Sequence, residues 1–246
     1  MEFKLMQPQH ADQVAEIHIE GQPGTLLTKL GHGFMSALYA GISQSPYGFG
    51  VVAVEGDQVA SVSVVSTGTS RLFADLRSRQ AVRLILPILP QLLKHPSLVR
   101  DIWNLWRYPS KASATNNQAT SRRQKVEAEF LFFGTHPAYR RQHIGMCVFD
   151  RAIAQAILRG VRQVSAVVDQ QNERMVTGFL EHGNKYGING HDTVFLLGRP
   201  MYRLVMNVDE GFFDRMEQHE AFEREADWIP VKTGFEAVRS AQHAIT

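Results

Sequence analysis

The chain has 246 residues, of which 44% are apolar and 20% charged, and its formal net charge is +2. This composition excludes a disordered or fibrous protein, and the charge is too small to argue for nucleic-acid binding. A single cysteine, Cys147, excludes an internal disulfide and fits a reducing compartment. We find neither a leader peptide nor an apolar run of about 20 residues. We therefore expect a cytoplasmic protein without a transmembrane segment.

The N-terminal part predicts a strand, two helices and a hairpin. Residues 2–6 are typical of a short strand, and a helix is predicted from residue 8 to the break at Gly21. A second amphipathic helix is predicted over 29–42, where apolar residues recur every four positions. Residues 48–55 and 58–66 are β-rich and flank the turn sequence Glu-Gly-Asp-Gln, which predicts an antiparallel pair. The buried face of the first helix would carry Ala11, Val14, Ile17 and His18.

Residues 70–124 predict a helical insertion. The segment begins with a strongly apolar helical stretch interrupted by Pro87 and Pro90, and residues 110–121 are polar. Ten lysine and arginine residues are spread through it. A solvated helix face is the favoured interpretation of these charges. A surface that grips an acidic carrier protein, a membrane or a nucleic acid is kept as an alternative.

The most informative stretch runs from residue 127 to Gly160. It begins with an apolar run, Phe130 to Phe133, which is typical of a strand buried on both faces. A basic turn, Arg-Arg-Gln-His-Ile-Gly at 140–145, follows, and then a helix predicted over 146–159 with Gly160 as its cap. The free backbone N–H groups and the dipole of a helix N-terminus attract anions. This arrangement of strand, turn and helix therefore predicts a phosphate site.

The C-terminal part predicts three further strands, a helix and a tail. A buried strand is predicted over 163–168, and a helix over 173–182. The last strands are predicted over 193–197 and 201–208. The tail, 209–246, begins as an amphipathic helix and is expected to dock on the domain or on a second subunit.

The stretch around the basic turn resembles the acyl-coenzyme A motif of the GCN5-related N-acetyltransferases, the GNAT superfamily. Arg140 takes the first position of the Arg/Gln-x-x-Gly-x-Gly/Ala turn and Gly145 the last, with His143 where the first glycine is usual. The lead-in Thr-x-Pro-x-Tyr-Arg at 135–140 also matches. The resemblance implies an α/β (α+β) fold with a mixed, mostly antiparallel sheet flanked by helices. The acyltransferase domain would be residues 1–208, with the insert at about 70–124 between the third and fourth strands, and 209–246 as a helical extension.

The resemblance also implies the positions that hold the coenzyme. Its pyrophosphate would lie on the turn, and its pantetheine arm along the fourth strand, in a gap where that strand diverges from the next. In a later helix, Asn172 and Phe179 keep the family register, although the family often has tyrosine at the second position. The cofactor-binding residues implied are Phe133, Gly134, Thr135, Arg140, Arg141, Gln142, His143, Ile144, Gly145, Asn172 and Phe179.

The candidate catalytic residues are two glutamates and one tyrosine. A primary amine has a pKa near ~10.4, so a group must accept its proton. Glu129 stands where family members that use a glutamate base carry it, and strand alternation puts Glu127 on the same face. Phenylalanine at 179 cannot donate a proton to the leaving thiolate. Tyr186 is the candidate acid, unless the thiolate leaves unassisted.

The leading hypothesis is an N-acyltransferase that moves an acetyl group from acetyl-CoA to a primary amine by direct attack. One alternative is a long-chain acyl-CoA or acyl-carrier-protein donor, and another is a non-catalytic coenzyme A-binding scaffold. The expected partner is an amine-bearing small molecule or peptide, with a homodimer as a further expectation. The histidines lack metal-binding spacings, so no metal site is expected.

Overall fold

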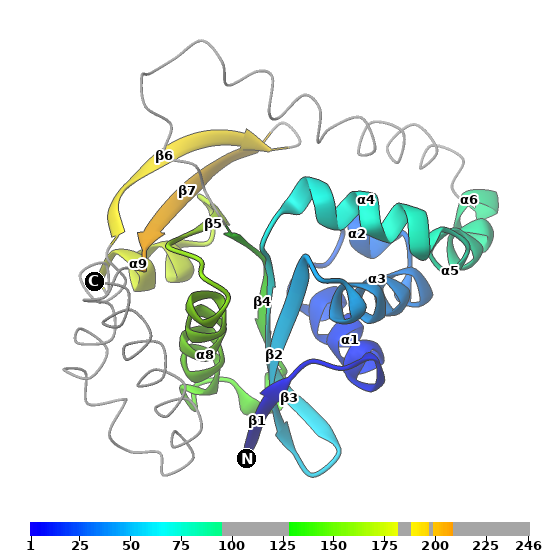
Figure 1. Ribbon diagram of the computed structural model, residues 1–246, viewed down its shortest axis with the longest axis horizontal. Coiled ribbons are helices and arrows are strands. Elements are labelled where there is room, and N and C mark those ends of the chain that lie inside the picture. The colour runs from blue at the N-terminus through cyan, green and yellow to red at the C-terminus, as the bar shows by residue number, and fades with distance from the viewer. Residues whose placement is uncertain (95–127, 182–187, 197–198, 209–246) are drawn as a thin grey trace.

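A seven-stranded sheet forms the centre of the computed structural model, which describes residues 1–94, 128–181, 188–196 and 199–208 (Figure 1). The strand order is β1-β2-β3-β4-β5-β7-β6. Every neighbouring pair is antiparallel except β4 and β5, which are parallel. The predicted mixed, mostly antiparallel sheet is therefore confirmed. The strands are β1 (Glu2–Leu5), β2 (Gly48–Glu55), β3 (Gln58–Ser66), β4 (Ala128–Thr135), β5 (Gln163–Asp169), β6 (Ile188–Leu196) and β7 (Arg199–Asn207).

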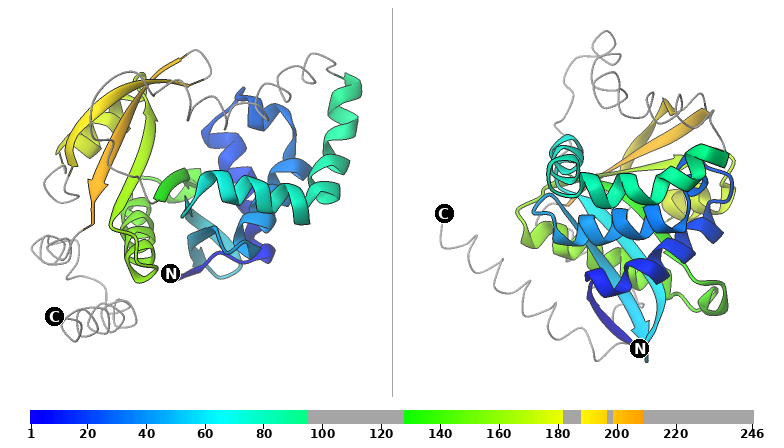
Figure 2. Two further views of the ribbon diagram at one scale, coloured as in Figure 1. Left: turned by 45° about the horizontal axis from the view of Figure 1, so that its top comes forward. Right: turned by 90° about the vertical axis from the view of Figure 1, so that its right-hand side faces the viewer.

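Helices cover both faces of the sheet. Helices α1, α3 and α4 lie on one face, and α8 and α9 lie on the other (Figures 1 and 2). The helices are α1 (Ala11–Gly21), α2 (Leu26–Lys29), α3 (His32–Gln44), α4 (Thr69–Arg79), α5 (Ala81–Ile85), α6 (Leu89–Lys94), α8 (Ile144–Leu158) and α9 (Glu173–Glu181). Short 3₁₀ turns occur at η1 (Pro8–His10), η2 (Leu86–Ile88) and η3 (Pro137–Tyr139).

Two hydrophobic cores result, one on each face. Successive side chains of a strand point to opposite faces, so Val62 and Val64 of β3 pack with α1 and α3, whereas Val65 packs with α8. Phe130 of β4 stacks on Phe149 of α8 with ring centroids 4.3 Å apart. The strands at the centre of the sheet are thus buried on both faces, as the apolar run around residue 130 predicts.

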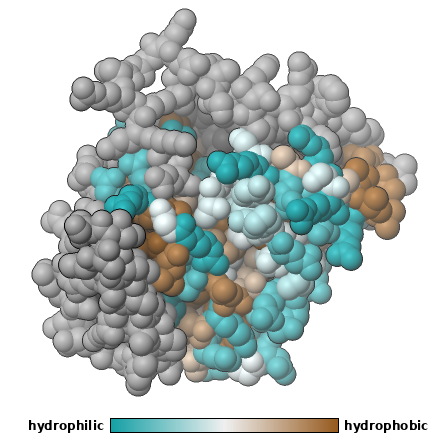
Figure 3. All heavy atoms as spheres, viewed as in Figure 1, coloured by the Kyte–Doolittle hydropathy of each residue, from teal (hydrophilic) through white to brown (hydrophobic). Residues whose placement is uncertain are grey.

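The predicted helical insertion between the third and fourth strands is confirmed over α4, α5 and α6. Pro87 lies in the first turn of the 3₁₀ segment, where its missing N–H costs no hydrogen bond. Several apolar side chains here face solvent, and Figure 3 shows them as a brown patch at the end of the molecule that α5 and α6 occupy. The exposed set is Val82, Ile85, Leu86 and Leu89. Residues 95–124 of the predicted insert and the predicted tail at 209–246 lie outside the described residues.

Some predicted boundaries were wrong. The helix predicted over 29–42 begins at His32, because Gly31 takes a φ of 91° that interrupts the helix. The strand predicted over 193–197 begins at Ile188. The last strand begins at Arg199 and contains Pro200, which pairs with Phe195 of the edge strand β6. Proline is tolerated there because it is next to the start of the strand.

Gly134 of β4 is required by packing on the α1 face. A Cβ at this position would lie 2.6 Å from the Phe132 ring and 3.0 Å from Ile17. We expect Gly134→Ala to lower the free energy of unfolding by about 1–3 kcal/mol, because the buried neighbours must shift. Urea denaturation checks this. Gly21→Ala is the matched control, since nothing lies within 4 Å of its Cβ, and an equal loss in both variants would contradict the packing argument.

Candidate active site

Strands β4 and β5 diverge halfway along β4. They pair only from Ala128 to Phe130, which oppose Val164 to Ala166. Beyond Phe130, β4 continues to Thr135 and remains paired with β3 alone. The divergence that the resemblance implies between these two strands is therefore present. An extended molecule that enters it can hydrogen-bond to the exposed edge of β4 as an added strand does.

A β-bulge marks the start of the divergence. Val64 of β3 opposes Phe132 and the next residue, Val65, opposes Phe130, so Leu131 has no partner on β3. A bulge locally disrupts the hydrogen-bond ladder between two strands and bends the strand that carries it. The sequence gives no signal for this feature, because a bulge depends on the register of two strands that are far apart in the chain.

The basic turn presents backbone N–H groups that the protein does not use. Arg141 and His143 have φ values of 67° and 59°, in the left-handed region. His143 caps α8 without a side-chain hydrogen bond. The first backbone hydrogen bond of the helix is donated by the Cys147 N–H to the His143 carbonyl oxygen. Within the described residues, the amides from Arg141 to Met146 donate to no acceptor. The turn can therefore accept an anion, as P-loop-like helix N-termini do.

Gly145 brings the start of α8 against β4. A Cβ here would lie 2.9 Å from the Thr135 hydroxyl oxygen and 3.0 Å from the Phe133 ring. Thr135 is fixed in turn by Ser61, whose hydroxyl oxygen is 3.0 Å away. The Arg140 Nε donates to the Thr135 carbonyl oxygen at 3.2 Å, which ties the turn to the end of the strand. Close contact between helix and strand therefore sets the position of the free amides.

The other predicted coenzyme positions are the side chains of the turn and two residues at helix α9, Asn172 and Phe179. The side chains of the turn face solvent, except for that of Ile144, which is buried in the core. The Asn172 Oδ1 accepts the Met175 amide at 3.3 Å and so caps α9. Phe179 is 6% exposed and packs edge-on against Phe149, in the core rather than at the turn. The structure thus brings residues 133–145 together and places these two residues on a separate element.

A cavity of about 310 Å³ opens at the start of β4, on the face opposite α8. Glu129 lies in it and accepts a hydrogen bond from the Thr69 hydroxyl at 2.7 Å. From Glu129 to the bulge at Leu131 is two residues, or about 7 Å along a strand. The predicted base therefore borders the gap between β4 and β5. The lining is Ser66, Gly68, Thr69, Ser70, Arg71, Ala128, Glu129, Ser165 and Arg203.

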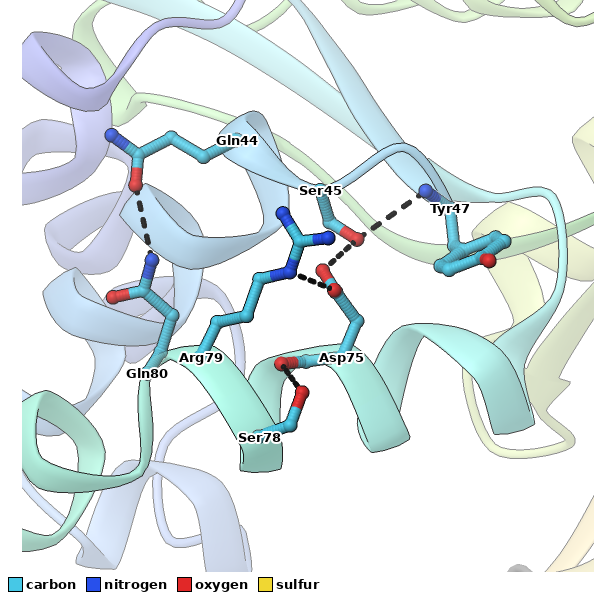
Figure 4. Close-up of polar contacts among 7 residues, drawn as sticks. All are labelled: Gln44, Ser45, Tyr47, Asp75, Ser78, Arg79 and Gln80. Carbon is cyan, nitrogen blue, oxygen red and sulfur yellow. Dashed lines mark hydrogen bonds and ion pairs between the residues drawn. The ribbon is translucent and has the colours of Figure 1, made fainter.

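Polar contacts join the middle and the C-terminal end of helix α4 to the end of α3 (Figure 4). Asp75 accepts from the Ser45 hydroxyl at 2.7 Å and from the Arg79 Nε at 2.8 Å. At the C-terminal end of α4, the side-chain amide of Gln80 donates to the Gln44 Oε1 at 3.2 Å. These contacts orient α4 so that Thr69 stays within reach of Glu129.

Sequence reasoning did not find most of the cavity. Arg203 offered a signal, because it is the single charge in the mostly apolar strand predicted over 201–208. Thr69 and Ser165 are common residue types and belong to no motif. Two further predicted residues, Glu127 and Tyr186, lie outside the described residues.

A buried histidine lies directly under β4. His18 of α1 stacks on Phe132 with ring centroids 4.1 Å apart, and its Nδ1 hydrogen-bonds to the Tyr39 hydroxyl. The sequence places His18 on the buried face of its helix but does not predict this pairing. Burial lowers the pKa of His18 to about 4 and raises the pKa of Tyr39 well above its ordinary value. Both groups are therefore neutral at pH 7.

The lowered pKa of His18 makes stability depend on pH. The unfolded histidine titrates near ~6.5 and the folded one near 4, so the unfolded chain binds the proton more readily and stability falls as the pH falls. Between pH 7 and pH 5 this group should remove about 2 kcal/mol from the free energy of unfolding. Urea melts of the wild type and His18→Gln check it. Between pH 7 and pH 5, the free energy of unfolding should fall by about 2 kcal/mol less in His18→Gln than in the wild type. The same pH dependence in both proteins would contradict the lowered pKa of His18.

The comparisons with known proteins identify the fold. An acetyltransferase structure matches with a TM-score of 0.50 and 12% identity, over 85% of this chain and 100% of its own. A protein from Desulfovibrio desulfuricans, named as an acetyltransferase of the GNAT family, matches with the same score and identity, over 85% and 99%. No family model matches the sequence, and neither does any curated protein. The chain therefore has the fold of the GNAT acetyltransferases.

Among the described residues, no helix is both long and apolar enough to span a bilayer. The same part of the chain brings no three histidine, cysteine, aspartate or glutamate side chains together as a metal site.

Proposed function

We propose that the protein is an N-acyltransferase that transfers an acetyl or other acyl group from acyl-CoA to a primary amine. The observation that carries the proposal is the gap between β4 and β5, which leads at the end of β4 to a turn with unused amides. An acyl-CoA molecule needs both features, a groove for its pantetheine arm and an anion site for its pyrophosphate. The domain would be residues 1–208, with 209–246 as an extension.

The coenzyme would be held mainly by the backbone of the turn. The amides from Arg141 to Gly145 would receive the pyrophosphate, while the exposed Arg140 and Arg141 side chains add charge-assisted contacts. The edge of β4 from Phe133 to Thr135 would bond to the pantetheine arm. His143 adopts the backbone conformation that the usual glycine allows, at a cost of about 1–2 kcal/mol. Its side chain is exposed beside the anion site and is available as a further donor.

The chemistry would take place where the gap meets the cavity. Glu129, alone or with Glu127, would accept the proton of the acceptor ammonium, directly or through water, so that the free amine attacks the thioester carbonyl. Phe179 is buried and cannot protonate the leaving sulfur. Tyr186 would do so, or the thiolate would leave unassisted, since a thiol has a pKa near ~8.5.

Two alternatives share this geometry. A long acyl chain or an acyl-carrier protein could replace acetyl-CoA, with the exposed apolar patch on α5 and α6 as a docking surface. The second alternative is a scaffold that binds coenzyme A without turnover. It is favoured by Phe179, where the family often has tyrosine, and by His143, where the family usually has glycine.

Calorimetry and thiol release together test the proposal. We expect saturable binding of acetyl-CoA, competition by free coenzyme A, and thiol release that depends on an added amine. Binding without release for any amine would favour the scaffold. Release only with long acyl chains or a loaded carrier protein would favour the other alternative. Absence of binding to every donor would overturn the proposal.

A further inference from the structure

The cavity at Glu129 contains charges that do not neutralise one another. Arg71 and Arg203 face it together with Glu129, which gives its described lining a formal charge of +1. No ion pair within 4.0 Å joins Glu129 to either arginine, although all three line one cavity of about 310 Å³. Separated charges of opposite sign in a small cavity are suited to a ligand that carries both signs itself.

Arg203 provides the strongest sign of a missing partner. It lies in β7 between Val167 of β5 and Asp192 of β6, on the face away from α8, whereas its neighbour Leu204 points into the α8 core. Asp192 is exposed, and no ion pair within 4.0 Å joins it to Arg203 in the described chain. Its Nε is buried and has no hydrogen-bond partner among the described residues. A buried donor on a charged group is costly to leave unpaired. An oxyanion in the cavity would satisfy it.

The start of α4 adds to the attraction for an anion. Gly68 caps the helix without a side-chain hydrogen bond, and the amides of Thr69, Ser70 and Arg71 donate to no acceptor in the described chain. The residues that carry these amides line the same cavity as Arg203. Two independent elements, a helix end and a strand, therefore bring unused N–H donors to the lining of one cavity that Glu129 also lines.

We infer that the amine acceptor carries an oxyanion, either a carboxylate or a phosphate, and is a small molecule of the amino acid or aminoalkyl phosphate class. The ammonium lies at Glu129 and the oxyanion at Arg203, Arg71 and the start of α4. The cavity volume is at the lower end of the range for small-molecule sites. A polyamine, which brings two or more positive charges into this positive lining, is disfavoured. The inference rests on the proposed function, because it names the acceptor for that same site.

Matched acceptors test the inference. Initial rates of thiol release from acetyl-CoA are compared for amino acids, the corresponding amino acid amides, aminoalkyl phosphates and a polyamine. We expect kcat/KM for at least one anionic acceptor to exceed that for its neutral counterpart about tenfold or more. Which of the two anionic series reacts identifies the oxyanion. Equal rates for the anionic and neutral members, or preference for the polyamine, would overturn the inference.

Arginine variants test whether Arg203 causes the preference for anionic acceptors. Arg203→Gln should remove most of the preference by raising KM for the anionic acceptor, with little change for the neutral amide. Arg83→Gln is the control, because Arg83 is exposed on α5 and does not line the cavity. A preference that survives in Arg203→Gln, or that falls equally in Arg83→Gln, would overturn the assignment of Arg203.

A binding measurement separates failure of this inference from failure of the proposed function. Calorimetry with the same acceptors, in the presence and absence of free coenzyme A, needs no turnover. If the protein binds no coenzyme A and transfers nothing, the proposed function fails, but selective binding of the anionic acceptors would still support the cavity assignment. If transfer occurs and the acceptors bind without regard to charge, only the inference fails.

Discussion

Replacing Glu129 with glutamine should lower turnover with a primary amine about a hundredfold or more, while the affinity for acyl-CoA stays nearly unchanged. Glutamine keeps the size of the side chain and an oxygen that can accept from Thr69, so the cavity should persist. It cannot take the ammonium proton. Steady-state thiol release measures turnover, and calorimetry measures donor affinity.

The matched control for this variant is Glu20→Gln, which neutralises an exposed glutamate on α1. Its turnover should equal that of the wild type. If Glu129→Gln also keeps the wild-type rate, Glu129 is not the base, and Glu127 becomes the remaining glutamate candidate. A higher pH should partly restore the rate of Glu129→Gln, because more of the amine is then unprotonated.

Phe149→Ala should lower the free energy of unfolding by about 3–5 kcal/mol, which is the largest stability effect that we expect. The Phe149 side chain is 1% exposed and stacks on Phe130 of β4. It also contacts Phe133 of β4 and Phe179 of α9 edge-on, with ring centroids 5.6 and 5.2 Å away. Removing this ring leaves a cavity where α8, α9 and the sheet meet. Urea denaturation checks the loss.

Phe73→Ala serves as the control, because Phe73 is 41% exposed on α4 and loses little buried area. We expect a change of less than about 1 kcal/mol for it. A loss in Phe149→Ala no larger than in Phe73→Ala would show that the aromatic cluster does not hold α8 in place.

Local patterns were enough to predict most of the fold. The hairpin over 48–55 and 58–66 has the predicted bounds, because a Gly-Asp turn between two β-branched runs encodes its own register. Helix α8 begins two residues earlier than predicted, because Ile144 and Gly145 already continue its turn. Predicted boundaries were wrong where pairing with another strand sets the end of an element. Strand β6 begins at Ile188 because it pairs with β7 there, and residues 188–192 have no β-rich pattern of their own.

The candidate site was only half predictable. The coenzyme side is one continuous stretch, so its strand, basic turn and helix can be found together in the sequence, and the resemblance to the GNAT motif implies its role. The acceptor side is assembled from β3, α4, β4, β5 and β7, and Thr69 and Glu129 are 60 residues apart in the chain. No sequence pattern joins such positions. The β-bulge at Leu131 and the His18–Tyr39 pair were missed for the same reason.

The central claim is that the amides from Arg141 to Gly145 bind the pyrophosphate of the coenzyme. Amide chemical shifts of ¹⁵N-labelled protein, followed as coenzyme A is added, test it most directly. We predict that the amides of the turn and of residues 133–135 shift together and saturate, while those of α5 (Ala81–Ile85), which belongs to neither the turn nor the gap, stay fixed. Saturable binding that shifts other amides and leaves residues 141–145 unchanged would contradict the account.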